Sequence, residues 1–151
     1  MLFTCNGKKL LFVGDAQWGN WAYWLYGKSV SGKDPGITDR AKEILGSIDF
    51  YKVGHHGSTN ATPIPAVGAL NPHCAAMCST ATKAYGKPDK GTEVPRTKLM
   101  AALEAKTGNQ MVRSDWVKAG DTDPDPEALE ELAKLPSGFS TPGDLYIDYH
   151  L

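Results

Sequence analysis

The sequence predicts one domain of the α/β class, with a mixed β-sheet flanked by helices. Three observations predict this fold. Short apolar runs alternate along the chain with segments of helical periodicity, the order expected of layered α/β units. The pair Asn6-Gly7 fits a type I′ turn, so the sheet should begin with an antiparallel hairpin. The chain has 151 residues, a reasonable length for one domain with a sizeable core.

Composition narrows the class of protein. The formal net charge of -1 gives no electrostatic support for binding nucleic acid or an anionic membrane. No apolar run approaches the roughly 20 residues that span a bilayer, and the N-terminus lacks the layout of a secretion signal. Three cysteines form no disulfide framework; we expect mostly buried thiols in a reducing compartment. These features predict a cytoplasmic protein.

The first elements are two strands, over 2–5 and 9–13. The second strand runs directly into Gly14-Asp15, so an apolar segment delivers a carboxylate at its end. A helix predicted over 18–26 comes next in the chain, and a loop rich in glycine, serine and lysine follows it at 28–36.

Residues 18–26 are densely aromatic. Trp18, Trp21 and Leu25 fit one face of a helix, which would pack its rings on the sheet. A second interpretation stays open, in which Trp18 or Trp21 stacks on a substrate because both lie near Asp15 in the sequence.

Thr38 can cap a helix that extends to about residue 48. Its apolar positions follow helical spacing and are Ile37, Ala41, Ile44, Leu45 and Ile48. The strand over 49–53 comes next.

Beyond residue 60 the pattern continues with a short helix over 62–70 and a strand of small residues over 75–79. A helix is predicted over 95–107 with Gly108 as its terminator, followed by a strand over 110–113.

The segment 118–143 is predicted to be an acidic, proline-bearing insertion with a short helix. Asp125 is the expected N-cap of that helix. Its expected apolar stripe consists of Leu129, Leu132 and Ala133. Residues 144–149 alternate in the manner of a closing strand.

The most informative stretch is 52–60, in which His55 and His56 stand side by side. An apolar strand ends there in a loop of glycine, serine, threonine and asparagine. Asp15 follows a similar strand. Ligand and metal sites collect at strand ends in open α/β sheets, so these residues indicate part of a metal site. A carboxylate can bridge two cations while a neutral imidazole binds one, and such metals lower the pKa of a bound water.

At this point the chain resembles the second half of a hydrolase of the metallo-β-lactamase fold, in the branch that includes domains of DNA-uptake competence proteins. The resemblance extends loosely from residue 2 to about 116. The stretches that carry it are Leu11-Phe12-Val13-Gly14-Asp15, Val53-Gly54-His55-His56-Gly57-Ser58, Tyr85-Gly86-Lys87-Pro88 and Arg113-Ser114-Asp115.

The resemblance implies roles for the matching positions. Asp15 would be the metal-bridging aspartate and His55 the last metal-ligating histidine. His56 would assist or orient beside the site and ranks second as a ligand; Asp15 and His56 are the residues assigned to catalysis. The side chains expected to line the cleft and contact the substrate are those of Trp18, Ser58, Thr59 and Lys87. Lys87 stands where many relatives of this branch carry a histidine, so this sequence lacks the imidazole at that position.

The family also has a His-x-His-x-Asp-His cluster, and this sequence contains no His-x-His. The resemblance therefore implies half of an αββα sandwich, a single partial domain over 1–151 that lacks most of the ligands of a two-zinc site, with Mn²⁺ or iron as alternatives. Half a sandwich would expose an inner apolar face, expected to include Leu10, Phe12 and Phe50. Either a missing N-terminal half or a second copy of the chain would cover that face.

Two functions follow as hypotheses. The first is metal-dependent hydrolysis of a phosphodiester or ester by metal-activated water, in which this chain alone would be inactive. Small-molecule and nucleic-acid substrates both stay open. The second is a truncated, non-catalytic α/β module that acts by binding or dimerisation. Thiol catalysis by Cys74 or Cys78 is a minor third alternative, since the local sequence suggests no partner for either thiol.

Overall fold

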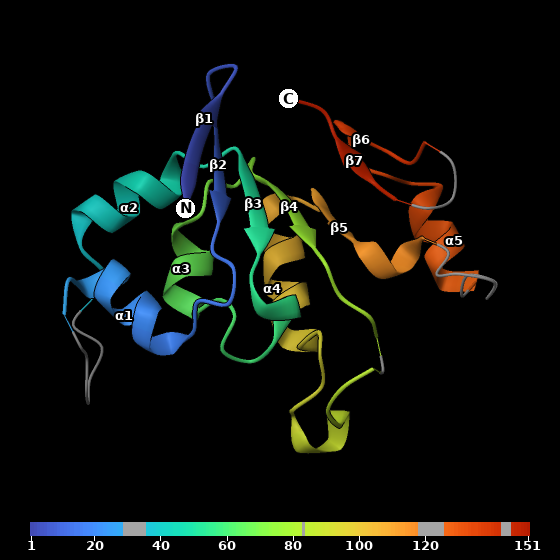
Figure 1. The fold of residues 1–151 in the computed structure, drawn as a ribbon, viewed down its shortest axis with the longest axis horizontal. Helices are drawn as coiled ribbons and strands as arrows, with labels where there is room; N and C mark the ends of the chain where they lie inside the picture. Colours follow the sequence, from blue (N-terminus) through green and yellow to red (C-terminus); the bar gives the residue numbers. More distant parts are fainter. Residues whose placement is uncertain (29–35, 83, 118–125, 143–145) are drawn as a thin grey trace.

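The computed structural model describes residues 1–28, 36–82, 84–117, 126–142 and 146–151. Within these ranges the protein is an α/β structure with a five-stranded mixed sheet and a separate two-stranded hairpin (Figure 1). The strands of the sheet, in spatial and chain order, are β1 (Leu2–Cys5), β2 (Lys8–Phe12), β3 (Phe50–Val53), β4 (Ala75–Cys78) and β5 (Met111–Arg113). The α/β prediction is confirmed, and so is the mixed sheet: β1 pairs antiparallel with β2, and the other neighbours are parallel.

Helices connect the parallel strands. They are α1 (Trp18–Tyr26), α2 (Asp39–Gly46), α3 (Ile64–Ala69) and α4 (Thr97–Thr107). Short 3₁₀ turns are η1 (His55–Gly57), η2 (Pro88–Lys90) and η3 (Ser114–Trp116). The C-terminal part contains α5 (Pro126–Leu132) and the hairpin strands β6 (Phe139–Ser140) and β7 (Asp148–Tyr149).

Local sequence signals explain several element ends. Asn6 and Gly7 both have positive φ, 50° and 76°, which is the type I′ geometry that the pair predicts. The Thr38 side chain accepts a hydrogen bond from the amide of Ala41 at 3.2 Å and so caps α2 as expected. Gly108 ends α4 in the left-handed conformation, φ 61°.

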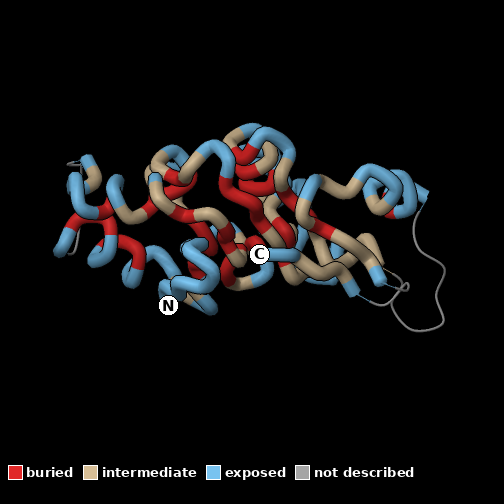
Figure 2. Tube along the Cα trace, turned by 90° about the horizontal axis from the view of Figure 1, so that it is seen from above, coloured by how far each residue is buried: buried red, intermediate tan, exposed pale blue. Residues whose placement is uncertain are grey.

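The main core lies between the sheet and α1–α4. Side chains alternate between the two faces of a strand, and Leu11, Tyr51 and Ala76 point to the face that the helices cover. They pack there with Trp21, Leu25, Leu45, Val67 and Leu103, among others, which are at most 6% exposed. Figure 2 shows the buried residues as a layer through the middle of the molecule.

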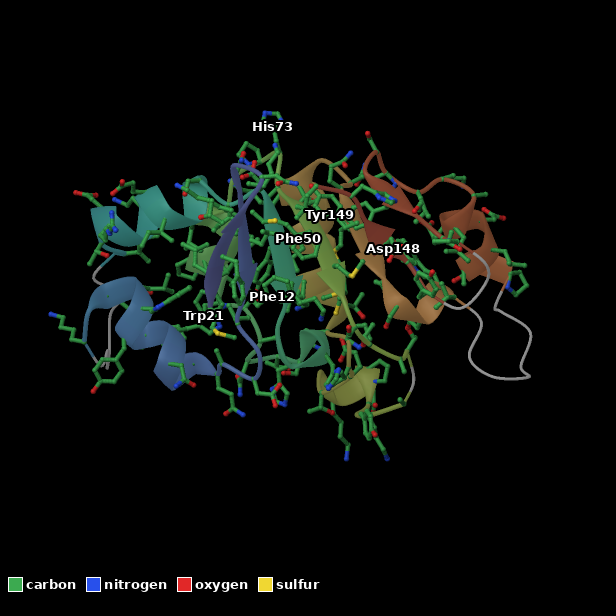
Figure 3. All side chains as sticks on the ribbon, turned by 45° about the horizontal axis from the view of Figure 1, so that its top comes forward. Phe12, Trp21, Phe50, His73, Asp148 and Tyr149 are labelled. Atoms are coloured by element: carbon green, nitrogen blue, oxygen red, sulfur yellow. The ribbon has the colours of Figure 1, made fainter. Side chains whose placement is uncertain are left out.

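The opposite face of the sheet is only partly exposed, which corrects the expectation of an open inner face. Leu10 and Phe50 are 8% and 5% exposed, because the C-terminal hairpin packs over them. Only Phe12 of the three expected residues is substantially accessible, at 38%. The Phe50 and Tyr149 rings stack with centroids 4.8 Å apart (Figure 3). The hairpin thus replaces water over the centre of this face and leaves the β1–β2 end uncovered.

Two expectations for the C-terminal part are wrong. The stripe of Leu129, Leu132 and Ala133 does not form the buried face of α5: Leu129 is 51% exposed, and the buried residue of the helix is Ala128. The segment expected to close the sheet pairs instead with β6, in the separate hairpin. The Asp125 cap, most of the 28–36 loop, residue 144 and the acidic stretch before α5 lie outside the described residues.

Among the described residues, no helix is long and apolar enough to cross a membrane.

Candidate functional site at the carboxyl ends of the parallel strands

Four parallel strands place their carboxyl ends along one edge of the sheet, towards which the arrows of β2, β3 and β4 point downward in Figure 1. The segments that follow β2, β3, β4 and β5 begin with Val13-Gly14-Asp15, Gly54-His55-His56, Ser79-Thr80 and Ser114-Asp115, respectively. The two stretches that the sequence singles out, those after β2 and β3, are therefore neighbours at this edge, because β2 and β3 pair directly.

The tips of β2 and β3 touch through their backbones. The amide of His55 donates a hydrogen bond to the carbonyl oxygen of Gly14 at 3.0 Å, one residue before Asp15. Gly54 makes this approach possible: a Cβ atom there would lie 2.5 Å from the Gly14 oxygen and 2.7 Å from a Val13 methyl group. The glycine before the two histidines is thus a packing requirement of the contact between the tips.

The histidine turn has an uncommon backbone. His55, His56 and Gly57 all have positive φ, at 43°, 55° and 74°. Left-handed conformations of residues other than glycine cost about 1–3 kcal/mol each and persist where the surroundings determine them; they cluster at functional sites. Here the Gly57 carbonyl accepts from the Arg96 amide at 2.7 Å. Gly57 also lies against Pro95, Met100 and Cys78, so the turn is clamped between α4 and the sheet.

The ring of His56 is oriented by β4. Its Nδ1 lies 2.9 Å from the carbonyl oxygen of Ser79. A carbonyl oxygen only accepts, so Nδ1 carries the proton and donates it. In the neutral ring the Nε2 lone pair is then left for a ligand or a proton, and the ring is exposed at the sheet edge. Metal-binding histidines are typically held by such a bond from the other ring nitrogen.

The ring of His55 is held by its own turn. Its Nδ1 lies 3.0 Å from the Ser58 hydroxyl, and the Ser58 amide donates to the His55 carbonyl at 3.0 Å. The loop continues to Ala61, whose amide donates to the Ser58 carbonyl at 2.9 Å and whose carbonyl accepts from the Trp21 indole at 2.9 Å. One continuous set of hydrogen bonds therefore connects α1 with the histidine turn.

The other expected site residues are all exposed. The carboxylate of Asp15 is exposed and has no hydrogen-bond partner among the described residues. Thr59 is an exposed loop residue two positions beyond the histidine turn. Trp18 is 43% exposed and packs edge-on against Tyr26, 6.2 Å between ring centroids. Lys87 lies in the exposed loop before η2, where its amide bonds to Thr92, and its ammonium has no hydrogen bond within the described chain.

The two isolated histidines lie elsewhere. His73, labelled at the top of Figure 3, precedes β4 and so sits at the amino end of that strand. His150 follows β7, and its Nε2 lies 2.7 Å from the Ser140 hydroxyl.

Sequence reasoning assigned no role to the residues that join the tips of β4 and β5. The Thr82 amide and hydroxyl both donate to an Asp115 oxygen, at 2.7 and 2.5 Å, and Arg113 pairs with the same carboxylate at 2.6 Å. Ser114 exchanges two hydrogen bonds with the backbone of Thr80. Burial would raise the pKa of Asp115, but hydrogen bonds from Arg113 and Thr82 and the Arg113 charge lower it below its ordinary value. This carboxylate is thus fully engaged in joining two loops. The serine, threonine and acidic residues that follow each strand in the sequence could have indicated this contact.

The donors at this edge fit part of a zinc site. A carboxylate and an imidazole with its Nδ1–H bonded to a carbonyl are suitable ligands. They do not form a complete site: within the described ranges, no group of three histidine, cysteine, aspartate or glutamate side chains is arranged to hold a metal.

The thiols lie in the core instead. Burial raises the pKa of Cys74 to about 12 and that of Cys78 to about 11, so both are protonated near neutral pH. Cys5 alone is exposed, which the expectation of mostly buried thiols allows. These properties favour no thiol chemistry at Cys74 or Cys78.

No family model, curated protein or solved structure matches this chain.

Proposed function

We propose that this chain contributes part of the metal site of a hydrolase, with the architecture of the carboxyl-terminal half of a metallo-β-lactamase fold. The observation that carries the proposal is the contact between the tips of β2 and β3. There a strained two-histidine turn is hydrogen-bonded to the residue before an exposed aspartate. A simple connecting turn does not require two consecutive histidines in left-handed conformations.

Each side chain has a role in this proposal. Asp15 offers a carboxylate without an internal partner, suited to bridging two cations. His56 offers Nε2 in a fixed orientation, and His55 lies beside it with its ring held by Ser58. A zinc ion bound there would lower the pKa of a water molecule and so supply hydroxide for hydrolysis. Manganese or iron would serve in the same way.

The remaining ligands must come from groups outside this set, because a catalytic zinc takes three protein ligands and no three histidine, cysteine, aspartate or glutamate side chains of the described residues are arranged to hold a metal. A separate polypeptide segment or a second copy of the chain are the possible sources. The substrate class we propose is a phosphodiester or an ester, which follows from the family resemblance; the net charge of the chain does not favour a polyanion.

Paramagnetic NMR with Mn²⁺ tests the metal site even when binding is weak. Substoichiometric Mn²⁺ should broaden the imidazole signals of His55 and His56, and leave those of His73 and His150 sharp. Addition of Zn²⁺ should restore the broadened signals by competition. His73 and His150 are suitable internal controls because both are exposed and lie away from the β2–β3 tips.

The variant Asp15→Asn keeps the size of the side chain and removes its charge. It should weaken Zn²⁺ competition at least tenfold, whereas His73→Ala should leave it unchanged. Equal broadening of all four histidines, or an unchanged response in Asp15→Asn, would contradict the proposal.

A second candidate is a binding module that forms a dimer through the sheet face opposite the helices, called here the helix-free face. The contact would use the β1–β2 end of that face, which the C-terminal hairpin leaves uncovered. Phe3 and Phe12 favour it: they are 47% and 38% exposed and pack together with ring centroids 5.6 Å apart. Sedimentation equilibrium distinguishes this candidate. A dimer that Phe12→Ser dissociates, with metal binding absent, would support the module and not the hydrolase.

A further inference from the structure

A small, mostly apolar cavity that is open to solvent lies beside the strand tip that carries Asp15. Its volume is about 180 Å³, and its lining consists of Met1, Val13, Ala16, Asn20, Trp21 and Trp24. Val13 and Ala16 are the two ends of the turn that holds Gly14 and Asp15, since the Ala16 amide donates to the Val13 carbonyl at 3.2 Å. One wall of the cavity is therefore the turn that carries Asp15, the candidate metal ligand.

The indoles form a corner in this cavity. Trp21 and Trp24 meet edge to face, with ring centroids 5.5 Å apart and planes at 81°. Trp21 is 2% exposed and its orientation is fixed by the bond to Ala61, whereas Trp24 is 48% exposed. Because Trp21 is buried, a planar ring at this corner can stack on Trp24, whose indole is accessible, in one of the arrangements that aromatic pairs prefer.

Size and polarity restrict the occupant further. Drug-sized ligands use pockets of about 300–1,000 Å³, while an apolar cavity of about 150 Å³ is enough for one benzene ring. Besides the indole N–H groups, the polar group among the lining side chains is the carboxamide of Asn20. Its Oδ1 accepts from the Gln17 amide at 3.1 Å, and its amide nitrogen has no partner among the described residues. That nitrogen can donate to an acceptor atom on the ring or next to it.

We infer that this cavity is a binding subsite for a single planar aromatic ring bearing a hydrogen-bond acceptor. Such a ring would lie next to the turn of Asp15, and the bond from Trp21 to Ala61 connects its back wall with the histidine loop. The identification of the ring as part of the substrate rests on the proposed function; the binding of a ring to the cavity does not.

Titration with benzamide, without any metal, tests the subsite. Benzamide should shift the indole N–H signals of Trp21 and Trp24 in a saturable manner and leave that of Trp116 in place. Cyclohexanecarboxamide has the same acceptor without a planar ring, so it should bind at least tenfold more weakly.

Two variants control for the lining. Ala16→Leu fills the cavity and should abolish the shifts while the remaining spectrum stays native. Tyr23→Ala removes an exposed aromatic ring of the same helix that does not line the cavity, and benzamide should bind this variant with unchanged affinity. If Ala16→Leu does not fold, Asn20→Asp, which keeps the acceptor for the Gln17 amide and removes the donor at an exposed position, should weaken benzamide binding at least threefold.

Absence of saturable shifts, equal binding of the two amides, or undiminished binding to the variants of Ala16 and Asn20 would overturn the inference. Because the titration contains no metal, a negative result leaves the metal proposal standing. Conversely, failure of the Mn²⁺ experiment would leave the ring subsite standing and remove only its connection to hydrolysis.

Discussion

The Nδ1 atom of His56 lies 2.9 Å from the carbonyl oxygen of Ser79. The tip of β3 is therefore joined to the tip of β4 by a side chain that the sequence predicts to be part of a metal site. This bond predicts the tautomer of the neutral ring. Long-range ¹H–¹⁵N spectra above the titration range of histidine should show His56 protonated at Nδ1. The exposed His73 provides the reference. Protonation of His56 at Nε2 would show that the bond does not form.

Gly54→Ala should destabilise the protein, because the added methyl group would meet the Gly14 oxygen at 2.5 Å. Overpacking of this kind costs about 1–3 kcal/mol. Urea denaturation should therefore show a lower midpoint with an unchanged slope. Gly68→Ala is the matched control: it lies in α3 with nothing within 4 Å of the new methyl group, so it should leave the midpoint equal or higher. Equal midpoints for the two variants would refute the close contact of the tips.

Asp115→Asn should lower stability at neutral pH, and its effect should shrink in acid. The folded pKa of Asp115 is depressed, so its contribution is present above the unfolded value, about 3.9, and is lost as pH falls through the folded pKa. The urea midpoints of wild type and variant should converge as the pH falls below about 4. Asp39→Asn, at an exposed ion pair on α2, should change the midpoint little. A difference that persists unchanged at pH 2 would contradict the assignment.

Cys5 should react with a thiol reagent much faster than Cys74 and Cys78 in the native protein. Cys5 is exposed, while Cys74 and Cys78 are buried with raised pKa values. In the native protein a thiol reagent should label about one cysteine rapidly at pH 8, and all three after denaturation. Cys5→Ser should abolish the rapid phase. Rapid labelling of that variant would mean that the core around the sheet opens readily.

Tyr149→Ala should uncover the helix-free face at its centre. Removing the ring that stacks on Phe50 exposes apolar surface, and aromatic pairs contribute about 0.5–1.5 kcal/mol beyond the area that they bury. The variant should bind more of the fluorescent probe anilinonaphthalene sulfonate and unfold at a lower urea concentration. Tyr146→Ala, at a residue 50% exposed, is the control and should change neither. If both variants behave as wild type, the hairpin does not cover the sheet in solution.

Local sequence signals were sufficient for most elements of the fold. Asn6-Gly7 specified the first turn, Thr38 the start of α2 and Gly108 the end of α4, since each acts through its own backbone or nearest neighbours. The C-terminal part was predicted less well. Leu129 has the spacing of a buried residue yet is exposed, because burial depends on whether another element lies opposite that face of α5.

The sequence by itself determined which residues stand at the strand ends: Asp15 after one apolar run, and His55 with His56 after another. Only the tertiary structure decided how they are held. The parallel pairing of β2 with β3 brings Gly14 against His55, and the pairing of β3 with β4 gives His56 the Ser79 carbonyl as its partner. These contacts join residues far apart in the chain, so they depend on strand order and register, which local periodicity does not encode. The same reason explains why the cover of Phe50 by Tyr149 emerged only from the folded chain.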